Sequence, residues 1–476
     1  MNYRITNFGP IKDATIEIKP LTVICGANNT GKSYITYSLF TLLDFLKSAS
    51  YNVFNAEKSR EFLQTGHCVI NLFKIIEIYK EFRHSQDRQN RFKEVLPAKM
   101  LLESNACAGS SFEFSLSDDD ERFLSGVIRS RSFNIPVKLN SEYQVRFLKR
   151  EGQTSLGCVI EPAPASDLDN LETMSEQKPF LPADGSILKQ VIPFTDVVMR
   201  SFALDVFMIT SERTGVVTFR PELSLLRDFV YNASPDKAKS FSNLRKQSGF
   251  KGYSFPIEKE LAFVFRLSTF LKSDSKEQGA TGDIVSFFED IASGAYVSDE
   301  NSGNSICYSP QGSGIKLTMS ASSSSVRTLS ELYFYLKYKA NFGQTLMVDE
   351  PELNLHPAAQ RKMARLFCRL VNSGIKVFVT THSDYLIREI NALTSMSTLP
   401  SSIRDNFLQK HGYDNSDLLP IDKVSCYVLR NGKSDRIKPD AQYGFAVDSF
   451  DDTIRQFNSL YSDLQDAIEE LSNVNS

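Results

Sequence analysis

The stretch that decides the fold is Gly26-Ala27-Asn28-Asn29-Thr30-Gly31-Lys32-Ser33, which fits the pattern G-x-x-x-x-G-K-[ST] without departure. In such a loop, backbone N–H groups wrap around phosphates and the following helix start adds positive potential. Lys32 is expected to reach the β- and γ-phosphates of ATP, and the Ser33 hydroxyl to bind Mg²⁺. The residues predicted to contact the nucleotide are Gly26, Asn28, Asn29, Thr30, Gly31, Lys32 and Ser33.

The residues on either side of this loop have the pattern that it requires. Leu21–Cys25 is a short apolar run without polar alternation, which is typical of a central parallel strand. A helical pattern begins at Lys32 and continues to about Ser48. Because strand, glycine-containing loop and helix follow one another, a chance match is the weaker interpretation.

A second apolar strand, Leu346–Val348, ends in two consecutive carboxylates. A carboxylate at the end of a parallel strand beside the phosphate loop can hold the metal, and we expect Asp349 to do so. Glu350 is expected to be the general base that activates the attacking water. The alternative is an acidic turn after a strand, which is common by itself.

The next strand, Lys376–Thr380, is followed by Thr381 and His382. A histidine at this strand end is expected to hydrogen-bond the γ-phosphate and to distinguish ATP from product. A lone histidine is more often structural. Because His382 lies one strand after Asp349 and Glu350, we predict that it is catalytic.

The composition is that of a globular protein with more than one lobe: 476 residues, 41% hydrophobic and 23% charged. A net charge of −3 gives no global field that recruits nucleic acid. The chain opens without a signal peptide and has no bilayer-spanning apolar run, so a cytoplasmic location without membrane contact is expected. Its seven cysteines form no CxxC pair and are predicted to be mostly buried thiols: Cys25, Cys68, Cys107, Cys158, Cys307, Cys368 and Cys426.

The chain closely resembles the OLD family, which groups with the RecF, Rad50 and SMC ATPases. The resemblance rests on Ile5–Ile11, on Asn28-Asn29 in the loop, on Asp349–Pro357 and on Thr381-His382-Ser383. It covers about residues 1–48 and 300–392, and the middle of the chain matches weakly. It implies an ABC-type head that binds ATP and Mg²⁺ between two copies, as a homodimer or a higher homo-oligomer.

The resemblance also suggests a role for a serine run. Ser323, Ser324 and Ser325 lie where such ATPases place a signature loop, which caps the ATP of the opposite subunit. Ser325 replaces the usual glycine, which is expected to weaken close approach to the γ-phosphate and to slow hydrolysis. Without the resemblance, the run is a helix cap in a flexible loop.

A glutamine sensor loop is not identifiable. By chain order, the turn after the apolar strand Val206–Thr210 offers Ser211, Glu212 and Arg213 as candidates for that role.

The predicted fold class is α/β, an ABC-type P-loop ATPase head with an antiparallel β subdomain and a helical insertion. A final hairpin is expected at Val424–Ile437, turning at Asn431-Gly432, and an acidic amphipathic helix at about 449–472. The expected divisions are the N-terminal core with the phosphate loop (1–50), a helical and β subdomain (51–215), the helical insertion (216–300), the C-terminal core (301–400), and a hairpin and helix that complete the head (401–476).

OLD nucleases carry a Toprim domain after the ATPase. The stretch after His382 is short, and its acidic residues Asp448, Asp451 and Asp452 show no strand-end Asp-x-Asp, so no intrinsic nuclease is expected. Family members without the nuclease occur in anti-phage systems such as PARIS and Septu, with a separate effector. By this analogy we expect a slow, nucleotide-gated sensor and scaffold for a Toprim- or HNH-type nuclease or a toxin.

The alternative is a RecF-like ATPase that clamps DNA in repair or replication. Part of the 216–300 block is basic, so a DNA-backbone contact is possible there, although a solvated helix face explains the same charges. The basic residues are Arg227, Lys237, Lys239, Arg245, Lys246 and Lys251.

Overall fold

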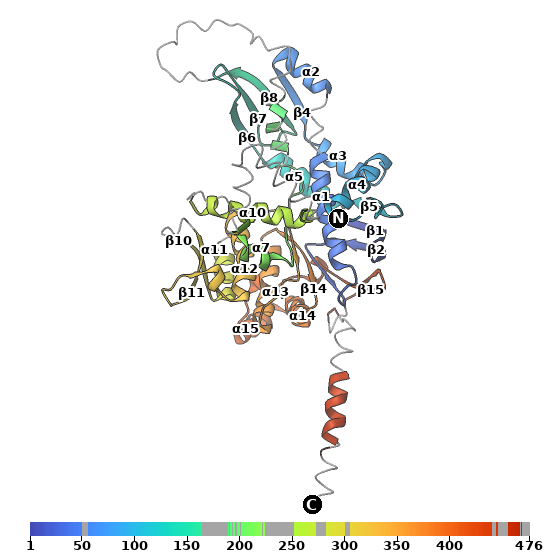
Figure 1. Ribbon diagram of the computed structural model, residues 1–476, viewed down its shortest axis with the longest axis vertical. Helices are drawn as coiled ribbons and strands as arrows, with labels where there is room; N and C mark the ends of the chain where they lie inside the picture. The colour runs from blue at the N-terminus through green and yellow to red at the C-terminus, as the bar shows by residue number, and fades with distance from the viewer. Residues whose placement is uncertain are drawn as a thin grey trace, which may run out of the picture. The chain divides into compact units, whose positions relative to one another are not determined.

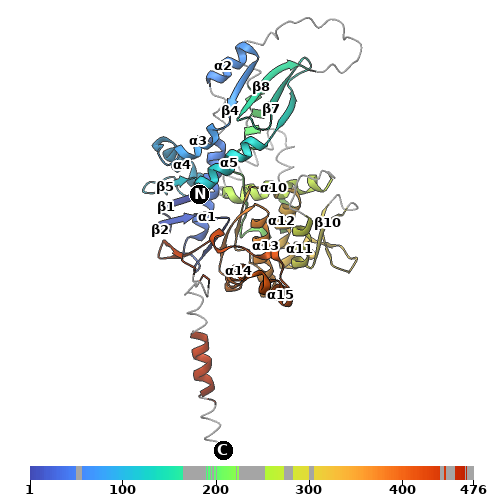
Figure 2. The ribbon, with the colours of Figure 1, turned by 180° about the vertical axis from the view of Figure 1, so that it is seen from behind.

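The structure is a computed structural model, drawn in Figure 1 and from behind in Figure 2. The chain divides into two compact units, one of Met1–Tyr3, Thr41–Glu94 and Phe112–Val206, the other of Arg4–Phe40, Val95–Ser111 and Phe207–Ser476. The structure describes residues 1–49, 56–163, 189, 191–192, 194–195, 198–199, 201–220, 222–223, 252–272, 282–299, 305–439, 444–445, 456–466 and 468.

The largest sheet has nine strands in the order β5-β1-β2-β16-β15-β3-β14-β13-β9. Strand β3 (Leu21–Cys25) is buried along its whole length, as its unbroken apolar run predicts. It pairs in parallel with β15 (Val424–Arg430) and β14 (Lys376–Thr381), and β14 pairs in parallel with β13 (Thr345–Asp349). The carboxyl ends of β3, β14 and β13 therefore lie at one edge of the sheet, where the three motifs follow.

The predicted hairpin at the C-terminal end of the core is confirmed. β15 and β16 (Lys433–Ile437) pair antiparallel, with Arg430 opposite Lys433. The turn residues Asn431 and Gly432 both have positive φ, 51° and 78°, as a two-residue hairpin turn requires. The sheet is completed by β1 (Asn2–Phe8), β2 (Ile11–Glu17), β5 (Ser111–Ser115) and β9 (Val206–Ile209).

Capping residues set the starts of the helices that carry the site. Helix α12 (Ser324–Tyr338) begins after Ser323, whose side chain accepts a hydrogen bond from Val326 N. Helix α13 (Pro357–Asn372) begins with a proline, a residue suited to a first turn, and lies beside α14 in Figure 1. The other helices around the core are α1 (Lys32–Ala49), α7 (Arg213–Thr218), α10 (Phe255–Lys272), α11 (Gly282–Ala292), α14 (Asp384–Ser397) and α15 (Ser401–His411), with 3₁₀ turns at Met319–Ala321, Asn415–Asp417 and Ile421–Lys423.

The other unit contains the predicted antiparallel β subdomain, a four-stranded sheet in the order β4-β8-β7-β6, with α2 beside β4 (Figure 2). The sequence analysis did not identify strand β4 (His67–Asn71). There Cys68 and Ile70 are buried and their neighbours exposed, because the segment pairs with β8. The remaining elements are β6 (Phe133–Lys138), β7 (Tyr143–Lys149), β8 (Ser155–Pro162), α2 (Ala56–Thr65), α3 (Lys74–Glu81), α4 (Gln86–Lys99) and α5 (Asp118–Ser130).

Together these features confirm the predicted α/β fold with a P-loop head. The helical insertion is present as α10 and α11, but it ends in a strand, β10 (Gly294–Asp299), which pairs with β11 (Ser305–Pro310) of a small sheet completed by β12 (Leu317–Thr318). Residues 456–466 of the expected C-terminal helix are helical. Across the described ranges, no helix is long and apolar enough to cross a membrane.

Several residues singled out in the sequence lie outside the described residues. They are the six basic residues of the insertion, Arg227, Lys237, Lys239, Arg245, Lys246 and Lys251, and the three aspartates Asp448, Asp451 and Asp452.

Candidate functional site: the phosphate loop and its carboxylates

The phosphate loop requires its two glycines. Gly26 has φ of +147°, and a Cβ there would meet the Leu429 carbonyl oxygen at 2.7 Å. Gly31 has φ of +101°, and its Cβ would meet Ile11 Cδ1 at 2.5 Å. Asn29 also has positive φ, 61°, which asparagine tolerates better than most residues. The sequence between β3 and α1 therefore folds into a tight wrap that other residue types would disturb.

Lys32 lies within this wrap and not on the surface. Its side chain is buried, with 6% of the residue exposed. Nζ donates hydrogen bonds to the carbonyl oxygens of Gly26 at 3.1 Å and Ala27 at 2.9 Å, while Thr30 Oγ1 donates to the same Ala27 oxygen at 2.9 Å. Burial lowers the pKa of Lys32, and the negative charges of Glu350 and Asp349 oppose that effect. The Lys32 ammonium group is thus held by two backbone carbonyl oxygens of its own loop.

Ser33 and Asp349 lie together, as the metal prediction requires. Ser33 Oγ donates to Asp349 Oδ2 at 3.2 Å, and Thr380 Oγ1 donates to Asp349 Oδ1. Burial raises the pKa of Asp349, while the hydrogen bonds from Thr380 and Ser33 lower it. A hydroxyl and a buried carboxylate supply the oxygen ligands that Mg²⁺ prefers.

This donor pair fits Mg²⁺ better than a transition metal. Over the part of the chain that the structure describes, no group of three or more His, Cys, Asp or Glu side chains could hold a metal. Mg²⁺ bound with substrate phosphates needs only one or two protein carboxylates. Ser33 and Asp349 are therefore the residues that would hold it, and its charge would offset that of the phosphates.

Glu350 and His382 form a hydrogen-bonded pair at the ends of β13 and β14. His382 Nε2 lies 3.2 Å from Glu350 Oε1. This hydrogen bond lowers the pKa of Glu350, against the effect of its burial. Glu350 has a left-handed backbone, with φ of +51°, and its N–H donates to the Thr380 carbonyl oxygen at 3.1 Å. The predicted base is thus ionised at neutral pH and touches the predicted sensor histidine.

The position of His382 depends on Glu352, whose role the sequence analysis missed. Glu352 Oε1 accepts hydrogen bonds from His382 N at 2.5 Å and Thr381 Oγ1 at 2.9 Å. Burial raises the pKa of Glu352, and these hydrogen bonds lower it. The available signal was the spacing of Glu352, two residues after Glu350, but a spacing does not tell which backbone a carboxylate reaches.

The three candidates for the sensor loop take three different positions. Glu212 Oε2 accepts from Tyr37 Oη at 3.0 Å and from Ser211 Oγ at 3.1 Å. Arg213 is buried, and its guanidinium donates to the carbonyl oxygens of Asp349 at 2.7 Å and Glu350 at 2.6 Å. Of the three, Arg213 is therefore the one in direct contact with the motif carrying the base.

The serine run opens α12 and does not join the phosphate loop of its own chain. Ser323 and Ser325 share a hydroxyl–hydroxyl hydrogen bond of 2.9 Å. Ser323 and Ser324 are exposed. No hydrogen bond among the described residues links the three serines to Gly26–Ser33. Within one chain, the structure thus brings together every predicted site residue except Ser323, Ser324 and Ser325.

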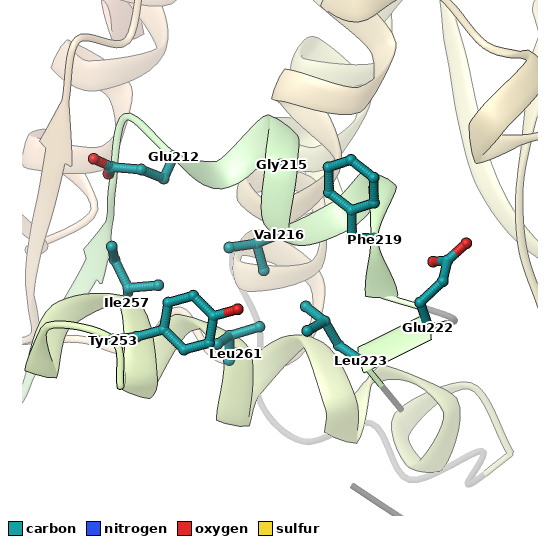
Figure 3. Close-up of a pocket in the computed structure, with 9 residues that line it drawn as sticks. All are labelled: Glu212, Gly215, Val216, Phe219, Glu222, Leu223, Tyr253, Ile257 and Leu261. Carbon is teal, nitrogen blue, oxygen red and sulfur yellow. The ribbon is translucent and has the colours of Figure 1, made fainter. Parts of the chain in front are cut away.

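A separate cavity of about 400 Å³ lies between α7 and α10. Figure 3 shows Val216 of α7 pointing toward Leu261 of α10 and toward Tyr253, which precedes α10. Two carboxylates, Glu212 and Glu222, also line the cavity, so its chemistry does not suit a triphosphate. The lining of this cavity includes no residue of the phosphate loop, where the nucleotide is predicted to bind.

Comparisons with known proteins agree with an ATP site. A family model described as an AAA ATPase domain matches residues 1–149 and 245–387. No curated protein matches the chain.

Among solved structures, the chain is similar to an Smc head bound to the C-winged helix domain of ScpA, with 13% identity, coverage of 92% of this chain and 96% of that chain, and a TM-score of 0.34. It is also similar to the Smc head domain with an extended coiled coil bound to the C-terminal domain of ScpA, derived from Pyrococcus furiosus, with 12% identity, coverage of 96% of this chain and 98% of that chain, and a TM-score of 0.33. It is similar as well to the SMC head domain from Thermotoga maritima, with 10% identity, coverage of 92% of this chain and 98% of that chain, and a TM-score of 0.29.

At these TM-scores the structural similarities are weak, and the assignment rests on the family model. That model covers more than half of the chain and includes the phosphate loop, Asp349, Glu350 and His382. The protein therefore belongs to the AAA ATPase domain family and is an ATPase.

Proposed function

We propose that this ATPase binds ATP between two copies of its head and uses slow hydrolysis to hold and release a separate effector protein. The observation that carries the proposal is the exposed start of α12, whose serines do not bond to their own phosphate loop. Hydroxyls and free amides at a helix start suit a phosphate, here that of a second copy. The effector class, a Toprim- or HNH-type nuclease or a toxin, and the setting in anti-phage defence follow from the resemblance to the OLD family.

Hydrolysis in this site assigns one task to each side chain. Lys32 exchanges its hydrogen bonds with the Gly26 and Ala27 carbonyls for bonds to phosphate oxygens. Glu350, kept ionised by His382, accepts a proton from the attacking water. His382 in turn donates from Nε2 to Glu350, which fixes the carboxylate that orients the water.

A slow rate follows from the serine that replaces glycine at position 325. Its side chain lies at the start of α12 and is already hydrogen-bonded to Ser323. A Cβ and a hydroxyl at this position keep the backbone of one copy farther from the γ-phosphate of the other.

The test is the variant Glu350→Gln, which keeps the shape of the side chain and removes the base. We expect kcat to fall about 10²–10⁴-fold, the usual contribution of a general base, while ATP binding persists. The variant should then accumulate as an ATP-bound dimer, detected by light scattering after size-exclusion chromatography, with ADP as the matched control.

Normal turnover in Glu350→Gln, or no ATP-dependent change in assembly, would contradict the proposal. Strong stimulation of the wild type by plain duplex DNA, with a steep salt dependence of binding, would instead favour the RecF-like alternative.

A further inference from the structure

Two glutamate carboxyl groups near the candidate nucleotide site are buried. Glu260 lies on α10 and Glu331 on α12, with 1% and 0% of each residue exposed. Burying a carboxyl costs free energy unless the group is neutral or paired. Arg213 is the buried cation near both, with 2% exposed, and its charge acts on both carboxyls. The three groups therefore form one charge system.

Burial decides how charge is divided within this system. Thr210 Oγ1 donates a hydrogen bond to Glu260 Oε2, whereas neither carboxyl oxygen of Glu331 has a hydrogen-bond partner among the described residues. Burial raises the pKa of both carboxyl groups, and the charge of Glu260 raises that of Glu331 further, which favours the neutral form of Glu331. Glu260, which keeps the hydrogen bond from Thr210, is then the carboxyl group that balances the Arg213 guanidinium.

The guanidinium uses its donors on backbone carbonyls and not on a carboxylate. Nη1 donates to the carbonyl oxygens of Thr210 at 2.8 Å and Asp349 at 2.7 Å, and Nη2 donates to that of Glu350 at 2.6 Å. Planar, forked donors suit this bridge, and a lysine ammonium lacks that geometry. Arg213 therefore ties the end of β9 to the end of β13.

The residue held in this way has an unfavourable backbone. Glu350 has φ of +51°, a left-handed conformation that is unfavourable for a non-glycine residue and persists only where its surroundings impose it. On one side β14 imposes it, through the bond from Glu350 N to the Thr380 carbonyl. On the other side Arg213 holds the Glu350 carbonyl. A change in this backbone would swing the carboxylate away from His382.

We propose that Arg213, balanced by Glu260, is a positioning residue for the general base, because its bonds to the Asp349 and Glu350 carbonyls keep the Glu350 carboxylate beside His382. The inference rests on the proposed role of Glu350 in hydrolysis.

The first test is Arg213→Lys, which keeps the positive charge near Glu260 and loses the bridge. Misplacement of a catalytic group by about 1 Å costs about 10²-fold in rate, so we expect kcat to fall by that order while the Kd for ATP changes less than about twofold. A companion variant is Glu260→Gln, which removes the carboxylate that balances the buried guanidinium and should lower kcat as well. Its matched control is Glu258→Gln, which changes an exposed glutamate on the same helix, α10.

The second test separates positioning from a general loss of structure. In a double-mutant cycle, Arg213→Lys should have no further effect on kcat once Glu350 is glutamine, because both changes act through the same carboxylate. Additive losses, or a loss of ATP binding in parallel with kcat, would overturn the inference, and so would wild-type kcat in Arg213→Lys. If Glu350→Gln itself hydrolyses ATP normally, the proposed function fails first, and the two failures are distinguishable.

Discussion

Lys32 is a buried ammonium group whose hydrogen bonds lie within its own loop. Its donors point to the Gly26 and Ala27 carbonyls, and its charge interacts with Glu350 and Asp349. ATP therefore does not meet an extended surface lysine. It replaces one set of hydrogen bonds to a cation by a stronger, charge-assisted set.

Lys32→Ala should remove nucleotide binding. Hydrogen bonds to charged groups contribute about 1.5–3 kcal/mol each, so loss of the bonds to two phosphates should raise the Kd for ATP by roughly 100-fold or more. Titration with a fluorescent ATP analogue measures this. Lys12→Ala, an exposed lysine in the same unit, is the control and should bind normally. Unchanged affinity in Lys32→Ala would refute the phosphate-loop assignment.

At the residue scale, the sequence predicted which candidate residues lie close together where each of them directly follows a strand end. The phosphate loop, Asp349, Glu350 and His382 each follow an apolar strand, and parallel strands bring such ends together. The contact of His382 was less predictable. The sequence suggested the γ-phosphate as its partner, and the structure places its Nε2 on Glu350.

At the scale of elements, α10 and α12 each bury a carboxyl group, Glu260 and Glu331, whose charges act on Arg213. Glu331 lies on α12 within a run of buried residues, and Thr328 of the same helix bonds to Thr214 at 2.9 Å and Asn354 at 3.1 Å. The helix that presents the serines is thus tied by polar contacts to α7 and to the loop after Glu350.

Glu331→Gln should show which carboxyl carries the proton. Burial raises the pKa of Glu331 well above its ordinary value of 4.5, so the folded protein binds a proton that the unfolded chain releases above that pH. Stability is therefore lost as pH rises from there toward the folded pKa, by at most about 1.4 kcal/mol per pH unit. Glutamine keeps the size and shape of the side chain without this titration.

The stability of Glu331→Gln relative to wild type should therefore increase as the pH rises above about 4.5, measured by urea unfolding at a series of pH values. A constant difference across this range would mean that Glu331 does not hold the proton.

The elements themselves were partly predictable. Hydrophobic pattern and turn chemistry identified β3, β13, β14 and the β15–β16 hairpin, because these signals are local. Strand β4 was missed, since five residues between helices form a strand only when β8 is there to pair with them. The proximity of Glu260 and Glu331 to Arg213 was equally invisible, because the two glutamates lie about seventy positions apart on separate helices.

At the scale of the whole molecule, the proposed site is composite, with the phosphate loop from one copy and the α12 serines from another. Such an arrangement makes catalysis a property of a symmetric dimer. Two inactive variants should then restore ATPase activity when they are mixed, provided that their substitutions lie in different halves of the composite site.

Mixing Lys32→Ala with Ser325→Tyr is the corresponding experiment. Each variant alone should be inactive, because one lacks the phosphate ligand and the other carries a bulky ring at the start of α12. In a random mixture, half of the dimers contain one intact composite site, so ATPase activity should return to roughly a quarter of the wild-type value.

The control mixture is Lys32→Ala with Glu350→Gln, whose defects lie in the same half, and it should stay inactive. If the first mixture also stays inactive, the α12 serines do not complete a second copy's site.

The buried cysteines offer a chemical view of the same molecule. All seven are free and buried, so a thiol reagent can reach each one only when the surrounding structure opens. Cys25 directly precedes Gly26, and its thiol donates to the Tyr427 carbonyl at 3.2 Å. The rate at which Cys25 is alkylated therefore measures how often the strand that precedes the phosphate loop opens locally. The measurement needs no engineered label, because the cysteine is native to the sequence.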